Sequence, residues 1–467
     1  MERREKFPFS MLNKKHIKSF QKILPDGFVL SEPGDCWAYG YDNSKMHVMP
    51  ECVLFAESKE QIKNILTYCY NNDIPITTRG RGTGNTGGSV PIENSIVLSL
   101  EKMNKIIKID TENRLAVVQP GVINKVLQDA LERENFFWGP DPSSQEYSTV
   151  GGNIANNSAG PRAVKYGTPR DNILGLEFVS GTGETHKTGV KTSKGVVGLD
   201  LTRLFVGSEG ILGVLTEATL KILPLNNTVK TFELTFSSLK SASDMIISLM
   251  SQPITPYKLE FIDEQSVGLI NSIKKNHYEE NTKAAILLEI DADKDYINAQ
   301  SEKLYEIMKQ KKHIKIQIAE NKSEVEELWK ARKSLSPALR ALGGYKINED
   351  IAVPISNLTI LLESLNEISQ RHEIRIVNFG HAGNGNIHVN LLFNTDEEKN
   401  SENAKKCLEE IFDLVLTLEG TISGEHGIGI IKKKFLEKEI KKSTLKLMSE
   451  IKKQFDPKKI LNPNKSI

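Results

Sequence analysis

A glycine-rich segment near the start of the chain constrains its fold more than any other feature. Residues 82–87 read Gly-Thr-Gly-Asn-Thr-Gly and satisfy the G-x-G-x-x-G pattern of dinucleotide-binding loops. In a Rossmann unit such a loop opens a helix, but here Gly88, Pro91 and an apolar, strand-like run at 96–100 follow, which leaves no room for a helix. A nicotinamide-binding fold of that type is therefore not expected.

The same loop has the chemistry that a bound pyrophosphate needs. Over residues 79–84 the glycines let backbone N–H groups converge on an anion without obstruction by side chains. A mobile turn in solvent is the alternative interpretation. Further clusters of small residues lie at 139–144 with 149–153, at 165–167 and at 207–213, and we predict that they are loops as well. Four such clusters in one domain predict an extended ligand that lies along the backbone.

The length of the chain, 467 residues, exceeds what one hydrophobic core usually holds. Glycine is frequent up to the fourth cluster and again at 380–429, whereas the stretch between is rich in Lys, Glu, Leu and Ile. We therefore predict a helical segment at 1–44, a first domain at 45–225 and a second domain at 226–467. Hydrophobic periodicity makes both domains α+β, the second with an antiparallel sheet and helices on one side.

Composition excludes several classes of partner. Lys and Arg number 61 and Asp and Glu number 60, so the net charge of +1 provides no general attraction for nucleic acid. No apolar run reaches the roughly 18 residues that a transmembrane helix needs. The four cysteines lie far apart without a Cys-x-x-Cys pair, which argues against a sequence-local iron–sulfur or zinc framework. Charged residues after the pair Arg3-Arg4 argue against an export signal, so we predict a cytoplasmic protein.

Two histidines are placed for metal binding by the pattern around them. Apolar residues alternate along 387–393, which puts His388 and Asn390 together on the other face of a strand. A glycine-rich turn at 380–385 precedes this strand, and a hairpin across that turn would bring His381 to the same end as His388. Structural roles for both histidines are the alternative.

A carboxylate that could complete the site lies in a separate glycine-rich loop. Glu425 and His426 follow a predicted helix at 403–419. Two imidazoles and one carboxylate make an open site for zinc, iron(II) or manganese, with positions left for substrate oxygens. His426, next to the proposed ligand, could accept a proton near neutral pH.

The motifs in their order resemble a known family. They are Arg-Gly-x-Gly-Thr at 79–83, Pro-Asp-Pro-Ser-Ser at 140–144, Gly-Gly-Asn at 151–153, Lys-Tyr-Gly at 165–167, Gly-Ser-Glu-Gly at 207–210, Gly-His-Ala-Gly-Asn-Gly-Asn-Ile-His at 380–388, Ser-Gly-Glu-His-Gly-Ile-Gly at 423–429 and Phe-Asp-Pro-x-x-Ile-Leu-Asn-Pro at 455–463. The series is similar to the FAD-linked 2-hydroxy-acid dehydrogenases, the D-lactate dehydrogenase and glycolate oxidase branch of the vanillyl-alcohol oxidase flavoprotein superfamily.

The resemblance implies an FAD-binding domain of two α+β subdomains at 45–225. A substrate cap would follow, with a C-terminal segment that returns to the flavin. The residues implied in FAD binding are Arg79, Gly80, Arg81, Gly82, Thr83 and Gly84 at the pyrophosphate, and Ser144, Thr149, Gly151, Gly152, Asn153, Glu209 and Gly210 along the rest of the flavin. Relatives with covalent flavin often carry a histidine in the first loop, and 79–89 contains none. We therefore expect noncovalent FAD.

For the second domain, the resemblance supports a divalent metal bound by His381, His388 and Glu425. Such a metal could bind the hydroxyl and carboxylate of a 2-hydroxy acid, with His426 as the proton acceptor. Three further residues are implied at the substrate, and they are Arg332, Lys346 and Asn390. Arg332 could grip a carboxylate in a bidentate fork, although it and Lys346 could instead be solvated. Two positions depart from the family pattern, Asn384 for aspartate and Asn464 for glycine.

The resulting functional hypothesis is oxidation of a small D-2-hydroxy acid, first D-lactate, by hydride transfer to FAD. D-2-hydroxyglutarate and glycolate are the next candidates. Electrons would leave to a partner protein, preferably an electron-transferring flavoprotein, with an iron–sulfur subunit as the alternative. A metal-dependent hydrolase with a nucleotide-binding domain is the competing enzyme class, and a noncatalytic flavoprotein scaffold is the third interpretation.

Overall fold

The computed structural model describes residues 12–226, 228–394 and 398–467, so the start of the predicted segment 1–44 lies outside it. The chain forms two compact units. The first contains residues up to Gly160, Gly167–Leu225 and Glu425–Ile467, and the second contains Pro161–Tyr166 and Asn226–Gly424. Within the described part, no helix is long and apolar enough to cross a membrane.

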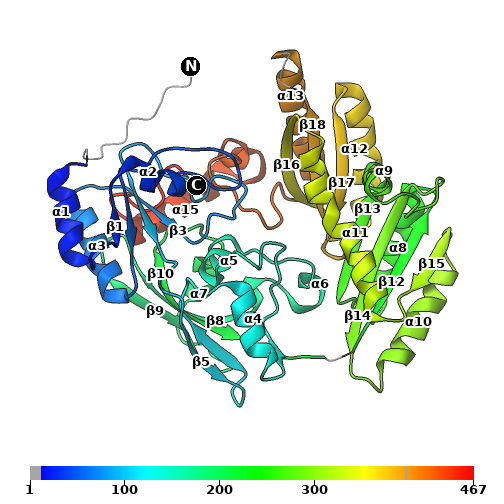
Figure 1. Cartoon of the computed structure of the whole chain (residues 1–467), viewed down its shortest axis with the longest axis horizontal. Helices are drawn as coiled ribbons and strands as arrows, with labels where there is room; N and C mark the ends of the chain where they lie inside the picture. The colour runs from blue at the N-terminus through cyan, green and yellow to red at the C-terminus, as the bar shows by residue number, and fades with distance from the viewer. Residues whose placement is uncertain (1–11, 227, 395–397) are drawn as a thin grey trace. The chain divides into compact units, whose positions relative to one another are not determined.

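The first unit contains two main sheets, a four-stranded sheet in the order β1-β2-β4-β3 and a five-stranded sheet in the order β5-β6-β10-β8-β9 (Figure 1). Strands β2, β4 and β3 are parallel, and the five-stranded sheet is antiparallel. The strands are β1 (Val29–Leu30), β2 (Cys52–Phe55), β3 (Ile76–Arg79), β4 (Ile96–Ser99), β5 (Ile106–Asp110), β6 (Leu115–Val118), β7 (Phe136–Phe137), β8 (Ile173–Val179), β9 (Thr185–Gly189), β10 (Val214–Lys221) and β11 (Leu223–Pro224).

Each main sheet of the first unit has its own apolar core, as two α+β subdomains require. The helices are α1 (Lys14–Ile23), α2 (Pro33–Cys36), α3 (Lys59–Asn71), α4 (Asn124–Glu132), α5 (Val150–Asn156), α7 (Leu201–Phe205), α14 (Leu436–Glu439) and α15 (Lys442–Phe455), with 3₁₀ turns η1 (Trp37–Tyr39), η2 (Pro169–Asp171) and η5 (Lys433–Phe435). Strand β3 leads directly into the first glycine cluster, and β4 follows that cluster without a helix. The sequence prediction that this is not a Rossmann loop is confirmed.

The C-terminal tail is part of the first unit. The backbone N–H of Ile76 donates to the carbonyl of Ile460 at 2.8 Å, and the N–H of Asn462 donates to the carbonyl of Ile76 at 2.8 Å. The tail therefore extends alongside β3. Asn464 has a φ of 61°, a left-handed conformation that asparagine tolerates better than most residues, so asparagine fits this position, where the resemblance implied glycine.

The second unit contains a seven-stranded antiparallel sheet in the order β15-β12-β14-β13-β17-β18-β16. Its strands are β12 (Thr228–Phe236), β13 (Lys258–Asp263), β14 (Ala284–Ala292), β15 (Lys315–Ile318), β16 (Tyr345–Ala352), β17 (Arg375–Gly380) and β18 (Asn386–Phe393). Its helices are α6 (Ala163–Tyr166), α8 (Leu239–Met250), α9 (Glu264–Ile273), α10 (Ile297–Lys309), α11 (Lys322–Ala341), α12 (Leu358–His372) and α13 (Glu398–Thr417), with 3₁₀ turns η3 (Ile355–Asn357) and η4 (Ala382–Asn384).

The prediction of an antiparallel sheet in this unit is confirmed. The prediction that helices cover only one side of this sheet is wrong. All nine residues of β14 are buried, whereas a sheet with one open face would expose every second residue. Helices α8 and α10 contact β12 and β14, and helices α9 and α11 share an apolar core with β13, β14 and β17.

Strand register gathers polar residues on the face of this sheet that packs against α9 and α11. His388 of β18 is paired with Phe379 of β17 and with Asp350 of β16, and Asn390 is paired with Asn348. Because directly paired residues point to the same side, His388 and Asn390 share a face with these partners. The face that carries the predicted site is thus set by the pairing of three adjacent strands.

Candidate functional site

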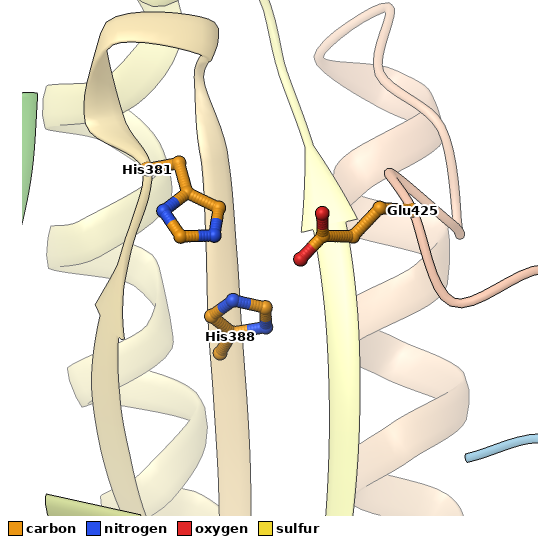
Figure 2. Close-up of side chains that lie close together, drawn as sticks. All are labelled: His381, His388 and Glu425. Carbon is orange, nitrogen blue, oxygen red and sulfur yellow. The ribbon is translucent and has the colours of Figure 1, made fainter. Parts of the chain in front are cut away.

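His381, His388 and Glu425 each place a ligand atom within 4.8 Å of the others (Figure 2). The two imidazole rings are 5.2 Å apart between centroids and almost perpendicular, at 85°. Glu425 directly follows Gly424, whose backbone N–H donates to the carbonyl of Asp350 at 3.0 Å. Its carboxylate accepts a hydrogen bond from the backbone N–H of Gly160 at 2.9 Å. The side chains form a donor set with nitrogen and oxygen ligands, which suits zinc, iron(II) or manganese.

The hairpin that joins the two histidines depends on glycine. Gly385 ends the turn with a φ of 68°, and a Cβ atom there would lie 1.9 Å from the carbonyl oxygen of Val353. The expected hairpin is therefore confirmed, since β17 and β18 pair in register up to Phe379 and His388.

Glu260 on β13 orients His381, although the sequence pattern had not singled this residue out. Its Oε1 lies 2.5 Å from Nδ1 of His381, which leaves Nε2 as the nitrogen available to a metal. Glu260 is 1% exposed. Burial by itself would raise the pKa of this carboxyl, but the charges of His381 and Arg332 outweigh burial and hold the pKa well below its ordinary value. The sequence feature that could have indicated Glu260 is its position as a charged residue between the apolar residues Leu259 and Phe261 of β13.

Arg332 binds the other oxygen of Glu260. Its Nε and Nη2 lie 2.9 Å and 2.7 Å from Oε2 of Glu260, and its guanidinium lies 4.5 Å from the ring centroid of Phe379. The residue is buried against the sheet rather than solvated. Glu260 thus binds both Arg332, which is predicted to bind the substrate carboxylate, and His381, a predicted metal ligand.

The other two predicted substrate residues lie on β16 and β18. Lys346 is half-buried and paired with Leu392 in the sheet. Asn390 is fully buried, and its amide donates to the carbonyl of Val377 at 3.0 Å and accepts from Asn348 at 2.8 Å. In this conformation the side chain of Asn390 is committed to bonds inside the sheet.

Three of the four glycine clusters come together in the first unit. A Cβ atom on Gly80 would lie 2.5 Å from Oγ1 of Thr149, so the first loop packs directly against the start of α5. At the other end of α5, the backbone N–H of Gly207 donates to the carbonyl of Ile154 at 2.9 Å, and that of Glu209 donates to Ala155 at 2.8 Å. The first and fourth clusters therefore flank α5, which itself contains part of the second cluster.

Two expectations about the clusters need correction. The segment 149–153 was expected to be a loop, but Thr149 caps α5 by accepting the N–H of Gly152 at 3.1 Å, so Gly151, Gly152 and Asn153 are helical. The cluster at 165–167 is divided between the two units, since Gly167 belongs to the first unit. Lys165 and Tyr166 belong to the second unit, where both bind the carboxylate of Asp291.

The two arginines of the first loop have different surroundings. Arg79 is 6% exposed, donates to the carbonyl of Tyr41 and lies beneath Gly82. Burial lowers its pKa. Arg81 is exposed and pairs with Glu101 at 3.1 Å. Thr83, Gly84 and Ser144 are half-buried.

Several buried polar atoms beside these loops have no partner within the described part of the chain. They are Oγ1 of Thr78, Oδ2 of Asp42 and Oγ of Ser208. A Cβ atom on Gly84 would lie 3.9 Å from Oδ2 of Asp42, so this oxygen adjoins the first loop. Unpaired buried polar groups are costly, and a polar ligand with hydrogen-bonding edges would satisfy them. The three atoms fit a bound flavin nucleotide.

His426 continues the loop that begins at Glu425. Its carbonyl accepts a hydrogen bond from Oγ1 of Thr86 at 3.2 Å. Further along the loop, Ile428 and Gly429 donate their N–H groups to the carboxylate of Glu209 at 2.9 Å and 2.7 Å. The loop that carries the predicted base is therefore attached to the first and fourth glycine clusters.

Family models match both halves of the chain. Residues 50–189 match the model for an FAD binding domain, and residues 225–466 match the model for FAD linked oxidases, C-terminal domain. The chain is 38% identical over 442 residues to glycolate oxidase subunit GlcD of Bacillus subtilis (strain 168), with 94% of each chain covered. It is 34% identical over 437 residues to D-lactate dehydrogenase of Archaeoglobus fulgidus, with 92% of this chain and 95% of the relative covered.

Solved structures show the same fold at lower identity. A p-cresol methylhydroxylase with substrate bound superposes with a TM-score of 0.79 at 18% identity, and covers 97% of this chain and 96% of its own. An alkyldihydroxyacetonephosphate synthase gives a TM-score of 0.76 at 16% identity, with 98% and 87% covered. The resemblance inferred from the motifs is confirmed, and the chain belongs to the FAD-linked oxidases, flavoprotein oxidoreductases with an FAD-binding domain and a separate C-terminal domain.

Proposed function

We propose that this chain is an FAD-dependent dehydrogenase that oxidises a small D-2-hydroxy acid, with D-lactate converted to pyruvate as the first candidate. The observation that carries the proposal is the group His381, His388 and Glu425, with Arg332 joined to His381 through Glu260. The names of the two relatives support a 2-hydroxy acid, since one is a D-lactate dehydrogenase and the other a glycolate oxidase subunit. The FAD-binding domain favours redox chemistry over the hydrolase alternative.

Within the proposed site, His381, His388 and Glu425 would hold one divalent cation, zinc, iron(II) or manganese. Bound FAD would accept the hydride from the substrate Cα, and the cation would lower the pKa of the substrate hydroxyl. His426 would accept the hydroxyl proton at its imidazole. Arg332 and Lys346 would bind the substrate carboxylate, and Asn390 would orient the substrate after leaving its bonds inside the sheet.

The substrate is identified by a panel assayed with an artificial dye as electron acceptor. D-lactate, L-lactate, glycolate and D-2-hydroxyglutarate would be compared by kcat/KM, and D-lactate should give the highest value. A higher value for glycolate or D-2-hydroxyglutarate would reassign the substrate within the class. A higher value for L-lactate would reject the proposed stereochemistry.

FAD should be bound noncovalently. The first loop lacks a histidine for attachment, and the buried polar atoms beside it can hold the cofactor by hydrogen bonds alone. Precipitation of the purified protein with acid should release the yellow colour into the supernatant. Flavin that stays in the washed pellet would show a covalent bond.

Replacing Glu260 by glutamine should weaken metal affinity by roughly 10–100-fold, the usual effect of losing a charged partner behind a histidine ligand. Bound FAD should be retained, because Glu260 lies in the other unit. The matched control is Glu289→Gln, since Glu289 is as buried, lies on the same face and binds Trp329 and Lys258 instead. Equal metal affinity of the two variants, measured by titration calorimetry, would contradict the role of Glu260.

We also propose that this chain is cytoplasmic and that a partner protein reoxidises its reduced flavin. The preferred partner is an electron-transferring flavoprotein, and the alternative is an iron–sulfur subunit. The sequence provides neither a Cys-x-x-Cys relay nor a Rossmann fingerprint for a nicotinamide. All four cysteines are buried and free. Turnover of D-lactate by the isolated chain should therefore be slow with NAD or oxygen and fast with a reconstituted partner. Rapid turnover with NAD or oxygen alone would remove the need for one.

A further inference from the structure

A lysine in the C-terminal tail is buried in the first unit without enough partners. Lys465 is 1% exposed, and its Nζ donates to Oγ1 of Thr77 at 2.9 Å. Within the described part of the chain this is the one hydrogen bond of its ammonium group, although such a group carries three donors. Burying a charge is costly unless it is paired, so the position of Lys465 calls for a further partner.

Lys452, another buried lysine of the same unit, has a hydrogen-bond acceptor for each donor of its ammonium group. Its Nζ donates to the carbonyls of Ile211 and Leu461 and to Oδ2 of Asp456, each at 3.0 Å. These three bonds account for all its donors and fix helix α15 to the tail. A structural role therefore explains the burial of Lys452. The bond to Thr77 uses only one donor of Lys465, and the other two have no acceptor among the described residues.

The surroundings of Lys465 carry unused negative charge. Asp42 is 2% exposed, and its Oδ2 has no partner among the described residues. Burial lowers the pKa of Lys465 to about 7, while the carboxylates of Asp42 and Glu209 act to raise it and Lys452 lowers it further. Burial therefore disfavours the ammonium form, and a new negative charge nearby would favour it.

The tail that carries Lys465 contacts the strand before the first glycine loop, the fourth glycine cluster and the loop at 423–429. Asn462 accepts the N–H of Thr78 at 2.8 Å and donates to the carbonyl of Glu209 at 2.6 Å. The N–H of Ser466 donates to the carbonyl of Gly429 at 3.0 Å. Thr77, the partner of Lys465, lies on β3 just before the first loop. Lys465 thus lies in a tail segment that is bonded next to two of the clusters predicted to bind FAD, the first and the fourth.

We propose that Lys465 supplies the positive charge that stabilises the FAD ring system after two-electron reduction, and so raises the reduction potential of the bound flavin. The reduced ring carries negative charge unless it takes up a second proton, and charge near the ring is a main way in which proteins tune flavin electronics. In a buried site with a low effective dielectric, one ammonium group strongly stabilises a nearby negative charge. The proposal rests on FAD binding and not on the metal or the substrate.

The test is the midpoint potential of bound FAD, measured against reference dyes in variants of the full chain. Lys465→Met and Lys465→Gln remove the charge, and the glutamine can keep a hydrogen bond to Thr77. Reduced FAD should bind roughly tenfold less tightly relative to oxidised FAD, which corresponds to a midpoint about 30 mV lower. Lys465→Arg should keep the parental value. Lys452→Met is the matched control, and should lower thermal stability without shifting the midpoint.

Each outcome decides the proposal. A parental midpoint in either neutral variant overturns it, as does an equal shift in Lys452→Met. If both neutral variants lose FAD, thermal unfolding of their apoproteins decides. Apoproteins of parental stability support a charge required by the cofactor, whereas unfolded apoproteins assign Lys465 to the fold and overturn the proposal. Failure of the 2-hydroxy-acid function would leave these readouts unchanged, because none of them uses substrate.

Discussion

Replacing His388 by alanine should lower turnover with D-lactate by at least roughly a thousandfold while FAD stays bound. The variant removes one of three proposed metal ligands, and a metal that polarises a substrate oxygen contributes several kcal/mol to the transition state. The loops predicted to bind FAD lie in the other unit, so the flavin absorbance should not change. His313→Ala is the control, since that ring bonds to the carbonyl of Lys311.

Removal of the metal with a chelator should reproduce the His388→Ala phenotype in the parental protein. Activity should return when zinc, iron(II) or manganese is added back, and the cation that restores it identifies the metal. The His388 variant should not respond to any of them. Full activity in a preparation shown by elemental analysis to be metal-free would contradict a catalytic metal.

Replacing His426 by alanine should slow flavin reduction by roughly 10²–10⁴-fold, the usual contribution of a positioned base. The bond from Thr86 goes to the backbone carbonyl of His426, so the loop should keep its position in the variant. Metal content should also be preserved, because Glu425 is unchanged. Stopped-flow measurement of flavin reduction isolates this step from reoxidation.

Two results for His426→Ala distinguish the possible bases. Partial recovery of the rate on adding imidazole would support a proton-accepting role for the missing ring. A parental rate of flavin reduction in the variant would assign the proton acceptor to another group.

The sequence predicts those features that depend on local pattern. Alternation along 387–393 and the glycine turn before it determine a hairpin, so the proximity of His381 and His388 follows from the chain itself. The absence of a helix after the first glycine loop follows in the same way from Pro91 and the strand β4. These are short-range consequences of backbone geometry.

Features that depend on distant pairing could not be predicted. Glu260 reaches His381 because β13 pairs with β17 across more than a hundred residues of chain, and no local pattern encodes that contact. Lys465 reaches Thr77 because the tail extends beside β3. The helix α5 was missed for a different reason, since its two glycines disfavour a helix and the cap at Thr149 with tertiary packing overrides them.

Anaerobic mixing of the purified flavoprotein with small 2-hydroxy acids tests the proposed oxidation most directly. At least one of D-lactate, D-2-hydroxyglutarate and glycolate should bleach the oxidised flavin and yield one 2-oxo acid for each FAD reduced. Chelator-treated protein should keep its flavin oxidised under the same conditions. A flavin that stays oxidised with every one of these acids, in protein shown to contain both FAD and metal, would contradict the proposed function.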